Sequence, residues 1–256
     1  MIMIDKMAYT SNLRYVNPNL KCFFAFTTLI ICLIDSSILV SSITILTMVG
    51  ITLIFNKTPV TYYLKIMTIP LAFILLSTIT IIINVTSIPL DLFAINVGKF
   101  YLSISLKSLF LGVNLILKSI ACISCLYFLA LSTTFTDILL VLKNIHCPNI
   151  LIELMLLIYR FIFVLLDIAH NITLSQNSRL GNKDFKTSLK SMAELLSVLL
   201  VKSLKKASAL YDSMESRCYN DNINVLFECS KASTRSIILV ILFETFILII
   251  SLFISN

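Results

Sequence analysis

Long apolar runs dominate this sequence, and several of them have the length needed to cross a bilayer, which takes about 20 residues in a helix. The runs fall at about 22–34, 38–55, 66–85, 101–131, 151–168 and 237–254. They are continuous rather than alternating, which favours helices over a transmembrane barrel. Charged residues make up 13% of the chain, against roughly 25% in a soluble domain. The sequence therefore predicts an all-α integral membrane protein with about five transmembrane helices.

Short-range signals mark where several of these helices begin. Asn17-Pro18-Asn19 is typical of a helix start, with Pro18 near the first helical position. The break at Asp35 predicts a tight helical hairpin, 22–34 and 38–55, in which Asp35 caps the second helix. We expect Pro70 in the first turns of a span at 66–85, where proline is tolerated, and a loop at 86–100.

Six charged residues lie inside these apolar runs: Lys107, Lys118, Glu153, Arg160, Asp167 and Glu244. Ionisable groups at membrane depth are candidates for function, and they usually have a partner. For Arg160 we keep two interpretations, a structural pair with Asp167 or a helix-end carbonyl, and a coupling role. Glu244 is open in the same way and could pair with Lys118.

The composition excludes several classes of function. The net charge is +7, but no nucleic-acid-binding module accompanies it, so we expect no nucleic acid as a partner. Cys122 and Cys125 form a CxxC without a second pair, and the chain has two His, so we predict no metal site. No apolar run carries HExxH or a nucleophile beside a base, so we assign no catalytic residue and no bound cofactor.

One long polar stretch, 171–236, carries ten of the 20 Lys and Arg residues. The positive-inside tendency places it in the cytoplasm of a multi-pass plasma-membrane protein. If the N-terminus is also in the cytoplasm, the polar stretch lies there only if 151–170 does not cross the membrane, or if 86–131 contains one more span. We predict that 151–170 does not cross and that the C-terminus is external. We therefore expect that Cys229 is not labelled from outside. The predicted parts are N-terminal membrane helices at 1–135, a cytoplasmic or interfacial coupling region at 136–236 and a last transmembrane helix at 237–256.

Within the polar stretch, residues 188–216 have helical periodicity, with an apolar stripe on one side and Lys190, Lys202 and Lys205 off it. One interpretation is an amphipathic helix lying on lipid headgroups. Arginine motifs at both ends favour a protein partner, because the planar guanidinium binds carboxylates or carbonyls with defined geometry. The candidate residues of these two motifs are Ser178, Arg179, Leu180 and Gly181 at the first end, and Met214, Glu215, Ser216 and Arg217 at the second.

These motifs belong to a wider pattern along the chain. It comprises IDKMAY at 4–9 with NPNLK at 17–21, FTDIL at 135–139 with Pro148, LLIYRFIFVLLD at 156–167, SRLG at 178–181, and KSLKKA at 202–207 followed by YDSMESRCY at 211–219. In this order they resemble the CbiQ/EcfT family, the transmembrane (T) component of energy-coupling-factor (ECF) transporters, and most of all its cobalt-transport branch. One position departs from the family pattern: its second signature usually ends in Gly, where this chain has Cys218. If a left-handed turn closes the helix there, the substitution costs roughly 1 kcal/mol or more.

The resemblance implies a function and partners. A T component is a non-catalytic coupling subunit whose two arginine ends bind two ABC ATPase subunits, which hold the ATP. Movement of these ends is passed to a separate membrane substrate-binding (S) component, such as a cobalt-binding subunit. Gly181 is expected to supply the turn after the first motif. The resemblance to one branch implies cobalt, with nickel or a vitamin as alternatives; a stand-alone carrier or an intramembrane enzyme is the less favoured class.

Overall fold

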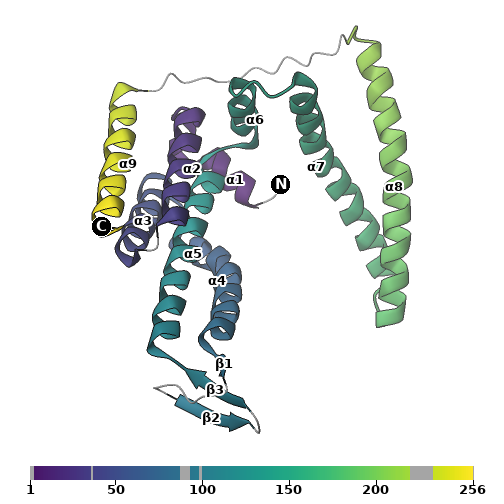
Figure 1. Cartoon of the computed structure of the whole chain (residues 1–256). Helices are drawn as coiled ribbons and strands as arrows, with labels where there is room; N and C mark the ends of the chain where they lie inside the picture. The colour runs from purple at the N-terminus through teal and green to yellow at the C-terminus, as the bar shows by residue number, and fades with distance from the viewer. Residues whose placement is uncertain (1–2, 36, 87–92, 98–99, 220–232, 256) are drawn as a thin grey trace. The chain divides into compact units, whose positions relative to one another are not determined.

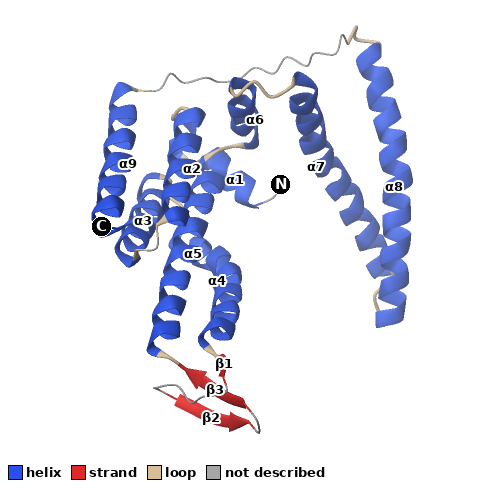
Figure 2. Cartoon of the chain, in the orientation of Figure 1, coloured by secondary structure: helices blue, strands red, loops and turns tan. Residues whose placement is uncertain are grey.

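A computed structural model describes residues 3–35, 37–86, 93–97, 100–219 and 233–255 of the chain (Figures 1 and 2). Most of the described part is helical, which confirms the predicted helical membrane protein. Its elements are α1 (Met3–Thr10), η1 (Asn12–Tyr15), α2 (Pro18–Ile34), α3 (Ile38–Gly50), the π-helical η2 (Ile51–Phe55), α4 (Val60–Ile82), β1 (Asn84–Thr86), β2 (Phe93–Val97), β3 (Phe100–Ile104), α5 (Leu106–Ser132), α6 (Phe135–Asn144), α7 (Asn149–Ser178), α8 (Phe185–Glu215) and α9 (Thr234–Ser255).

The chain divides into two compact units, and the division falls inside α6. The α5 unit comprises Ile2–Ile138 together with Glu228–Asn256, so α9 belongs with the N-terminal helices. The α7–α8 unit comprises Leu139–Phe227. The predicted assignment of 136–236 to a cytoplasmic coupling region remains a prediction.

Helix α5 is the centre of its unit, with α2, α3 and α4 packed against it. The buried cluster includes Phe24 from α2, Met48 from α3 and Phe128 from α5. Phe24 meets both Phe128 and Phe243 edge to face, with ring centroids 5.6 Å apart in each pair, the arrangement that aromatic quadrupoles favour. Aromatic contacts therefore connect α9 to the α2–α5 pair.

A polar cluster closes one end of this unit, where α5 leaves its last carbonyl groups without helical partners. Lys21 is 2% exposed, and its Nζ donates to the carbonyl oxygens of Ser132 at 2.8 Å and Leu13 at 3.0 Å. The side-chain amide of Asn56 donates to the carbonyl oxygen of Leu131 at 2.8 Å. Three segments far apart in sequence are thus tied together at the end of α5.

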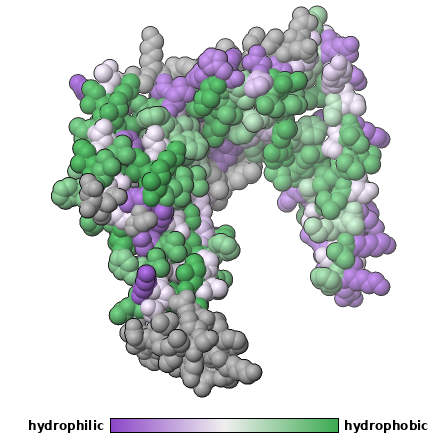
Figure 3. All heavy atoms as spheres, viewed as in Figure 1, coloured by the Kyte–Doolittle hydropathy of each residue, from purple (hydrophilic) through white to green (hydrophobic). Residues whose placement is uncertain are grey.

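Five helices in the described part are long and apolar enough to cross a membrane: Ile38–Phe55, Val60–Ile82, Leu106–Ser132, Asn149–Ser178 and Thr234–Phe253. Hydrophobic side chains cover much of the face of the helices seen in Figure 3. The set includes α7, whereas the shorter apolar α2, Pro18–Ile34, falls below the length limit. The expectation that 151–170 stays on one side thus rests on the charge distribution alone and remains a prediction.

Two expectations about the segment between the hairpin and α5 are wrong. Pro70 lies inside α4 rather than in its first turns, because the helix begins at Val60 after Pro59. The segment expected as a loop at 86–100 contributes to a three-stranded antiparallel sheet of order β1-β3-β2. In Figure 2 the sheet lies beyond the ends of α4 and α5 that it joins. Ser105 then caps α5 through a capping box with Ser108, so this helix starts later than predicted.

The start of α2 is confirmed, since the Asn17 side chain accepts from the Asn19 amide at the helix N-terminus. Asp35 does not cap α3, whose N-cap is Ser37; its carboxylate accepts from the Ser37 amide at 3.0 Å and so closes the turn instead. Glu244 accepts a 2.8 Å hydrogen bond from the Thr27 hydroxyl. Among the described residues it forms no ion pair with Lys118, so that suggested partner was wrong.

Candidate functional site: two arginine turns flanking α8

The first arginine motif forms a Schellman turn at the end of α7. The amide of Gly181 donates to the carbonyl oxygen of Gln176 at 2.8 Å, and the amide of Leu180 donates to that of Asn177 at 3.1 Å. These are the two bonds that define the motif. Arg179 directly precedes the left-handed residue Leu180, so its side chain projects from the C-terminal end of α7.

The second motif repeats this pattern at the end of α8. The amide of Tyr219 donates to the carbonyl oxygen of Met214 at 3.2 Å, and the amide of Cys218 donates to that of Glu215 at 3.0 Å. Arg217 occupies the position that Arg179 has in the first turn. The two arginines therefore leave the backbone from equivalent positions in two equivalent turns.

The left-handed residue of each turn is not glycine. Leu180 has φ 59° and Cys218 has φ 57°, a region that costs a side chain roughly 1–2 kcal/mol. A left-handed turn does close α8 at Cys218, so the expected energetic cost of a residue other than glycine applies there. Gly181 is not itself the left-handed residue but the one after it, so the turn does not need glycine at 181 for its backbone conformation.

Space is what requires glycine at 181. A Cβ atom at this position would lie 2.8 Å from the Gln176 carbonyl oxygen and 2.9 Å from the Ser191 hydroxyl. Ser191 is buried and donates from its hydroxyl to the Gly181 carbonyl oxygen at 2.7 Å. The Gln176 side-chain amide donates to the Ser191 carbonyl oxygen at 2.8 Å. The first turn is thereby fixed against the beginning of α8.

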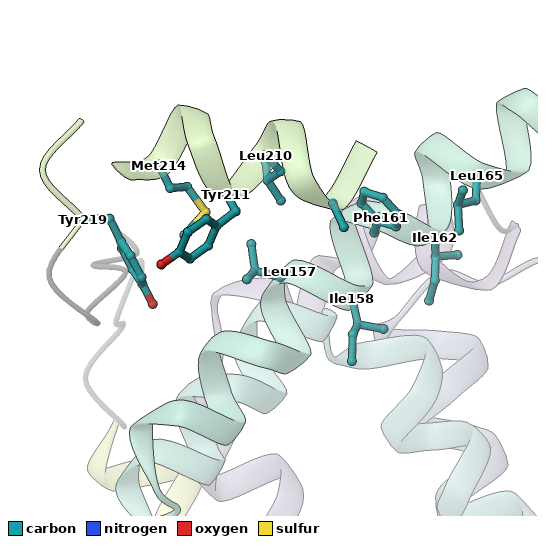
Figure 4. A pocket seen from close by; sticks show the side chains of 10 residues that line it. Leu157, Ile158, Phe161, Ile162, Leu165, Leu210, Tyr211, Met214 and Tyr219 are labelled. Carbon is teal, nitrogen blue, oxygen red and sulfur yellow. The ribbon is translucent and has the colours of Figure 1, made fainter. Parts of the chain in front are cut away.

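The second turn is held by an aromatic residue instead. The Tyr219 hydroxyl donates to the Glu153 carboxylate near the start of α7 at 2.7 Å. Tyr219 also lines an apolar hollow of about 500 Å³ between α7 and α8. In Figure 4, Leu210, Tyr211 and Met214 of α8 extend toward Leu157 and Phe161 of α7. Met214 and Tyr219 are the residues whose apolar contact commonly accompanies a Schellman turn.

A second hollow, of about 390 Å³, adjoins the first turn and has a different character. Its lining includes Arg179 and Lys202, with the polar side chains of Asn171, Ser175 and Gln176. Ile168 and Ile172 complete the lining, and none of the described residues that line it is acidic. Two cations, one from the end of α7 and one from α8, therefore line the same hollow.

The predicted site residues lie largely at the surface. Ser178, Arg179, Leu180, Glu215, Ser216 and Arg217 are exposed, and Gly181 and Met214 are half-buried. The hydroxyls of Ser178 and Ser216 donate back into their own helices, to the carbonyl oxygens of Leu174 and Ser213. The arginine side chains are consequently accessible to a partner.

The other predicted pair is not assembled. Arg160 and Asp167 are both exposed on α7, and within the described part of the chain they form no ion pair with each other. The alternative, a coupling role for Arg160, remains a prediction.

Sequence reasoning assigned no role to the residues that support the turns, Gln176, Ser191 and Glu153, and Ser191 reads as an ordinary polar residue of an amphipathic helix. Lys202 stands at the start of the segment that resembles the second signature, but nothing in the sequence places it beside Arg179. The available signal was indirect, because a buried serine hydroxyl needs a hydrogen-bond acceptor. Tyr219 was noted as part of the second motif but was given no role.

Within the described part of the α7–α8 unit, much of the apolar side of α8 is not covered by α7. Leu189, Met192, Leu196 and Leu204 are each more than half exposed. A helix with this much exposed apolar area usually contacts another protein or lipid.

Comparison with known proteins connects this geometry to a family. The model of the family CbiQ, described as cobalt transport protein, matches residues 10–226, which include both arginine turns. An uncharacterized protein of Methanocaldococcus jannaschii is 30% identical over 97% of this chain and 92% of its own length. The cobalt transport protein CbiQ of Salmonella typhimurium is 25% identical over 87% of this chain and 99% of its length. A putative fused cobalt transport protein CbiMQ of Methanocorpusculum labreanum is 31% identical over 85% of this chain, a match that spans 36% of the fused protein.

Proposed function

The chain belongs to the CbiQ family of cobalt transport proteins, and on this premise we propose that it is the transmembrane coupling (T) component of an ECF-type importer. In this proposal the chain is a multi-pass membrane subunit without catalytic residues or a bound cofactor of its own. Two ABC ATPase subunits bind ATP, and a separate S component binds the transported substrate.

The equivalence of the two arginine turns carries the proposal. Gln176–Gly181 and Met214–Tyr219 have the same hydrogen-bond pattern, with Arg179 and Arg217 in the same place. Two copies of one recognition element suit two related partner subunits, as a pair of ATPases would provide. The 31-residue helix α8 joins the two turns, so a change in the separation of the partners would act on one continuous element, as coupling requires.

The uncovered apolar surface of α8 supports the second half of the proposal. Leu189, Leu196 and Leu204 are exposed on this helix, and the S component and the lipid bilayer are the partners that would cover them. Movement of the arginine turns would then reach the S component through the same helix.

Cobalt is the substrate that we propose, because the relatives are named cobalt transport proteins. Nickel or a vitamin would require only a different S component. The choice of cobalt is tested by measuring the uptake of radioactive cobalt in cells that co-express the chain with the two ATPase subunits and the S component. Nickel is added as the competing ion. Uptake of nickel but not cobalt would overturn the substrate and leave the coupling role standing.

The docking role is tested by the double variant Arg179→Glu with Arg217→Glu. We expect it to insert into the membrane at normal yield and to lose the ATPases on affinity purification, because each guanidinium becomes a charge of opposite sign. Arg235→Glu is the matched control, since it reverses the charge of an exposed arginine of α9 outside both turns. Normal recovery of both ATPases with the double variant would refute the docking assignment.

A further inference from the structure

The two arginine turns share one backbone geometry but have different surroundings. The hollow next to the second turn is lined almost entirely by apolar and aromatic side chains, including Leu210, Met214 and Tyr219. The hollow next to the first turn contains Arg179 and Lys202 together with Asn171 and Ser175. A partner that grips both turns in the same way therefore meets two different chemical environments beside them.

We propose that Lys202 and Arg179 form one binding site for an acidic side chain of the ATPase that docks on the first turn. The proposal rests on the proposed function and adds a residue, Lys202, that lies 23 positions beyond Arg179 and outside both turns, 176–181 and 214–219. Lys202 is therefore a specificity-determining residue of the first docking site.

Charge is the first argument for an acidic occupant. Neither cation has an acidic partner among the described residues, and the lining of the hollow contains no carboxylate. Two like charges that face one hollow repel each other, and an incoming anion relieves that repulsion. The side-chain amide of Asn171 adds hydrogen-bond donors to the same surface, whereas the Ser175 hydroxyl and the Gln176 amide donate to the carbonyl oxygens of Asn171 and Ser191.

Position is the second argument, and it favours a protein carboxylate over a lipid phosphate. Gln176 lines the hollow and also supplies the carbonyl oxygen that closes the first turn. A subunit that binds the turn is therefore in contact with the rim of the hollow. An anionic lipid would instead have to reach a site shared with the docked subunit.

The inference predicts different salt sensitivity at the two ends. Binding at the first turn depends on exposed charges, whose interaction is screened as the Debye length falls from about 10 Å at 0.1 M salt to about 3 Å at 1 M. Binding at the second turn depends more on Met214 and Tyr219, which line the apolar hollow. Salt should therefore release a partner held only by the first turn sooner than one held only by the second.

The experiment isolates the first end by using Arg217→Ala as background. ATPase subunits co-expressed with the chain are bound to it in nanodiscs of neutral phosphatidylcholine, and the apparent Kd is measured at 0.1 M and 1 M salt. Lys202→Gln should weaken binding about two- to five-fold at low salt, the range of one exposed ion pair, and Lys202→Glu should weaken it further. Both effects should fade at 1 M salt. Lys205→Gln is the matched control, since it removes the same charge from α8 outside the lining of the hollow.

Each other result overturns the inference in a recognisable way. If Lys202→Gln and Lys205→Gln weaken binding equally, the lysines act only through net charge and the hollow is not a site. If the loss appears only when anionic lipid is added to the nanodiscs, the occupant is a headgroup. If Lys202→Gln has no effect while Arg179→Glu releases the ATPase, the inference fails and the proposed function stands. Retention of the ATPase by the double arginine variant overturns the proposed function itself.

Discussion

The Tyr219 hydroxyl donates a 2.7 Å hydrogen bond to the Glu153 carboxylate, which connects the end of the second arginine turn with the first residues of α7. The contact spans 66 positions in the sequence. Because Tyr219 also closes the Schellman turn through its amide, one residue fixes both the shape of the turn and its place against α7. The orientation of Arg217 therefore depends on a residue two positions further along.

Removal of this hydrogen bond should loosen the second turn. Tyr219→Phe should destabilise the α7–α8 contact by about 1–2 kcal/mol, because the bond has a carboxylate as its acceptor. The measurable result is faster modification of the neighbouring Cys218 thiol by a maleimide reagent, whereas Glu153→Gln, which keeps an acceptor oxygen, should show a smaller increase. Tyr211→Phe is the control, since it removes a phenol hydroxyl from the same hollow where the described residues offer it no partner. Equal rates in Tyr219→Phe and the unmodified chain would show that the bond does not hold the turn.

The left-handed residues predict a stabilising substitution. Cys218→Gly should raise the free energy of unfolding of the helix end by about 1 kcal/mol, because glycine adopts φ 57° without the penalty of a Cβ atom. Cys218→Ala separates this effect from loss of the thiol, and it should leave stability nearly unchanged. Amide hydrogen exchange at the last turn of α8 measures the difference. A protection gain shared by both variants would mean that the thiol, and not the backbone, is responsible.

Lys21 provides a test of the buried polar cluster. Lys21→Met should destabilise the α5 unit by about 2 kcal/mol, because the carbonyl oxygens of Leu13 and Ser132 lose their donor. Thermal unfolding in detergent, followed by exposure of buried thiols such as Cys22 and Cys125, gives the change in midpoint. Lys65→Met, an exposed lysine of α4, should leave the midpoint unchanged. A similar shift in both variants would indicate a general effect of lost charge.

The sidedness of the polar stretch can be read from Cys218. It is the one exposed thiol in the part of the chain that the structure describes, and Cys229, proposed above as the probe, lies outside that part. In a Cys229→Ser background, a membrane-impermeant maleimide should label Cys218 in inverted vesicles and not in sealed cells. Labelling in sealed cells would place the turns outside and would contradict the predicted orientation.

The sequence predicted helices wherever an apolar run and a start signal coincide. The N-cap at Asn17 and the C-terminal end of α8 could be predicted because capping depends on residues that are neighbours in the sequence. The start of α4 was missed because the polar residues of its first turns read as loop, and the sheet was missed because strands joined by short connections give little periodicity. The role of Asp35 differed because α3 begins after Ser37, so the Asp35 carboxylate meets the Ser37 amide before the helix and not an amide of its first turn.

At the candidate site, the sequence indicated both arginines and the unusual Cys218, but not the contacts that hold them. Arg179 and Arg217 lie in short local patterns, which a sequence displays directly. Ser191, Tyr219 and Glu153 act through contacts between α7 and α8, and only the folded arrangement brings their atoms together. The hollow that joins Lys202 to Arg179 depends on the packing of the same two helices, so no spacing rule could have suggested it.

The hydrogen bond from Lys21 to the Ser132 carbonyl oxygen joins residues 111 positions apart, and this separation has a consequence for biosynthesis. Lys21, α2 and α3 leave the ribosome well before the end of α5 exists, and α2 and α3 pack mainly against α5 rather than against each other. Until residue 132 has been synthesised, the Lys21 ammonium group can therefore reach only one of its two carbonyl partners, that of Leu13. The polar cluster at the end of α5 closes only when that helix is complete, so α2 and α3 cannot reach their final packing before the chain has been made as far as residue 132.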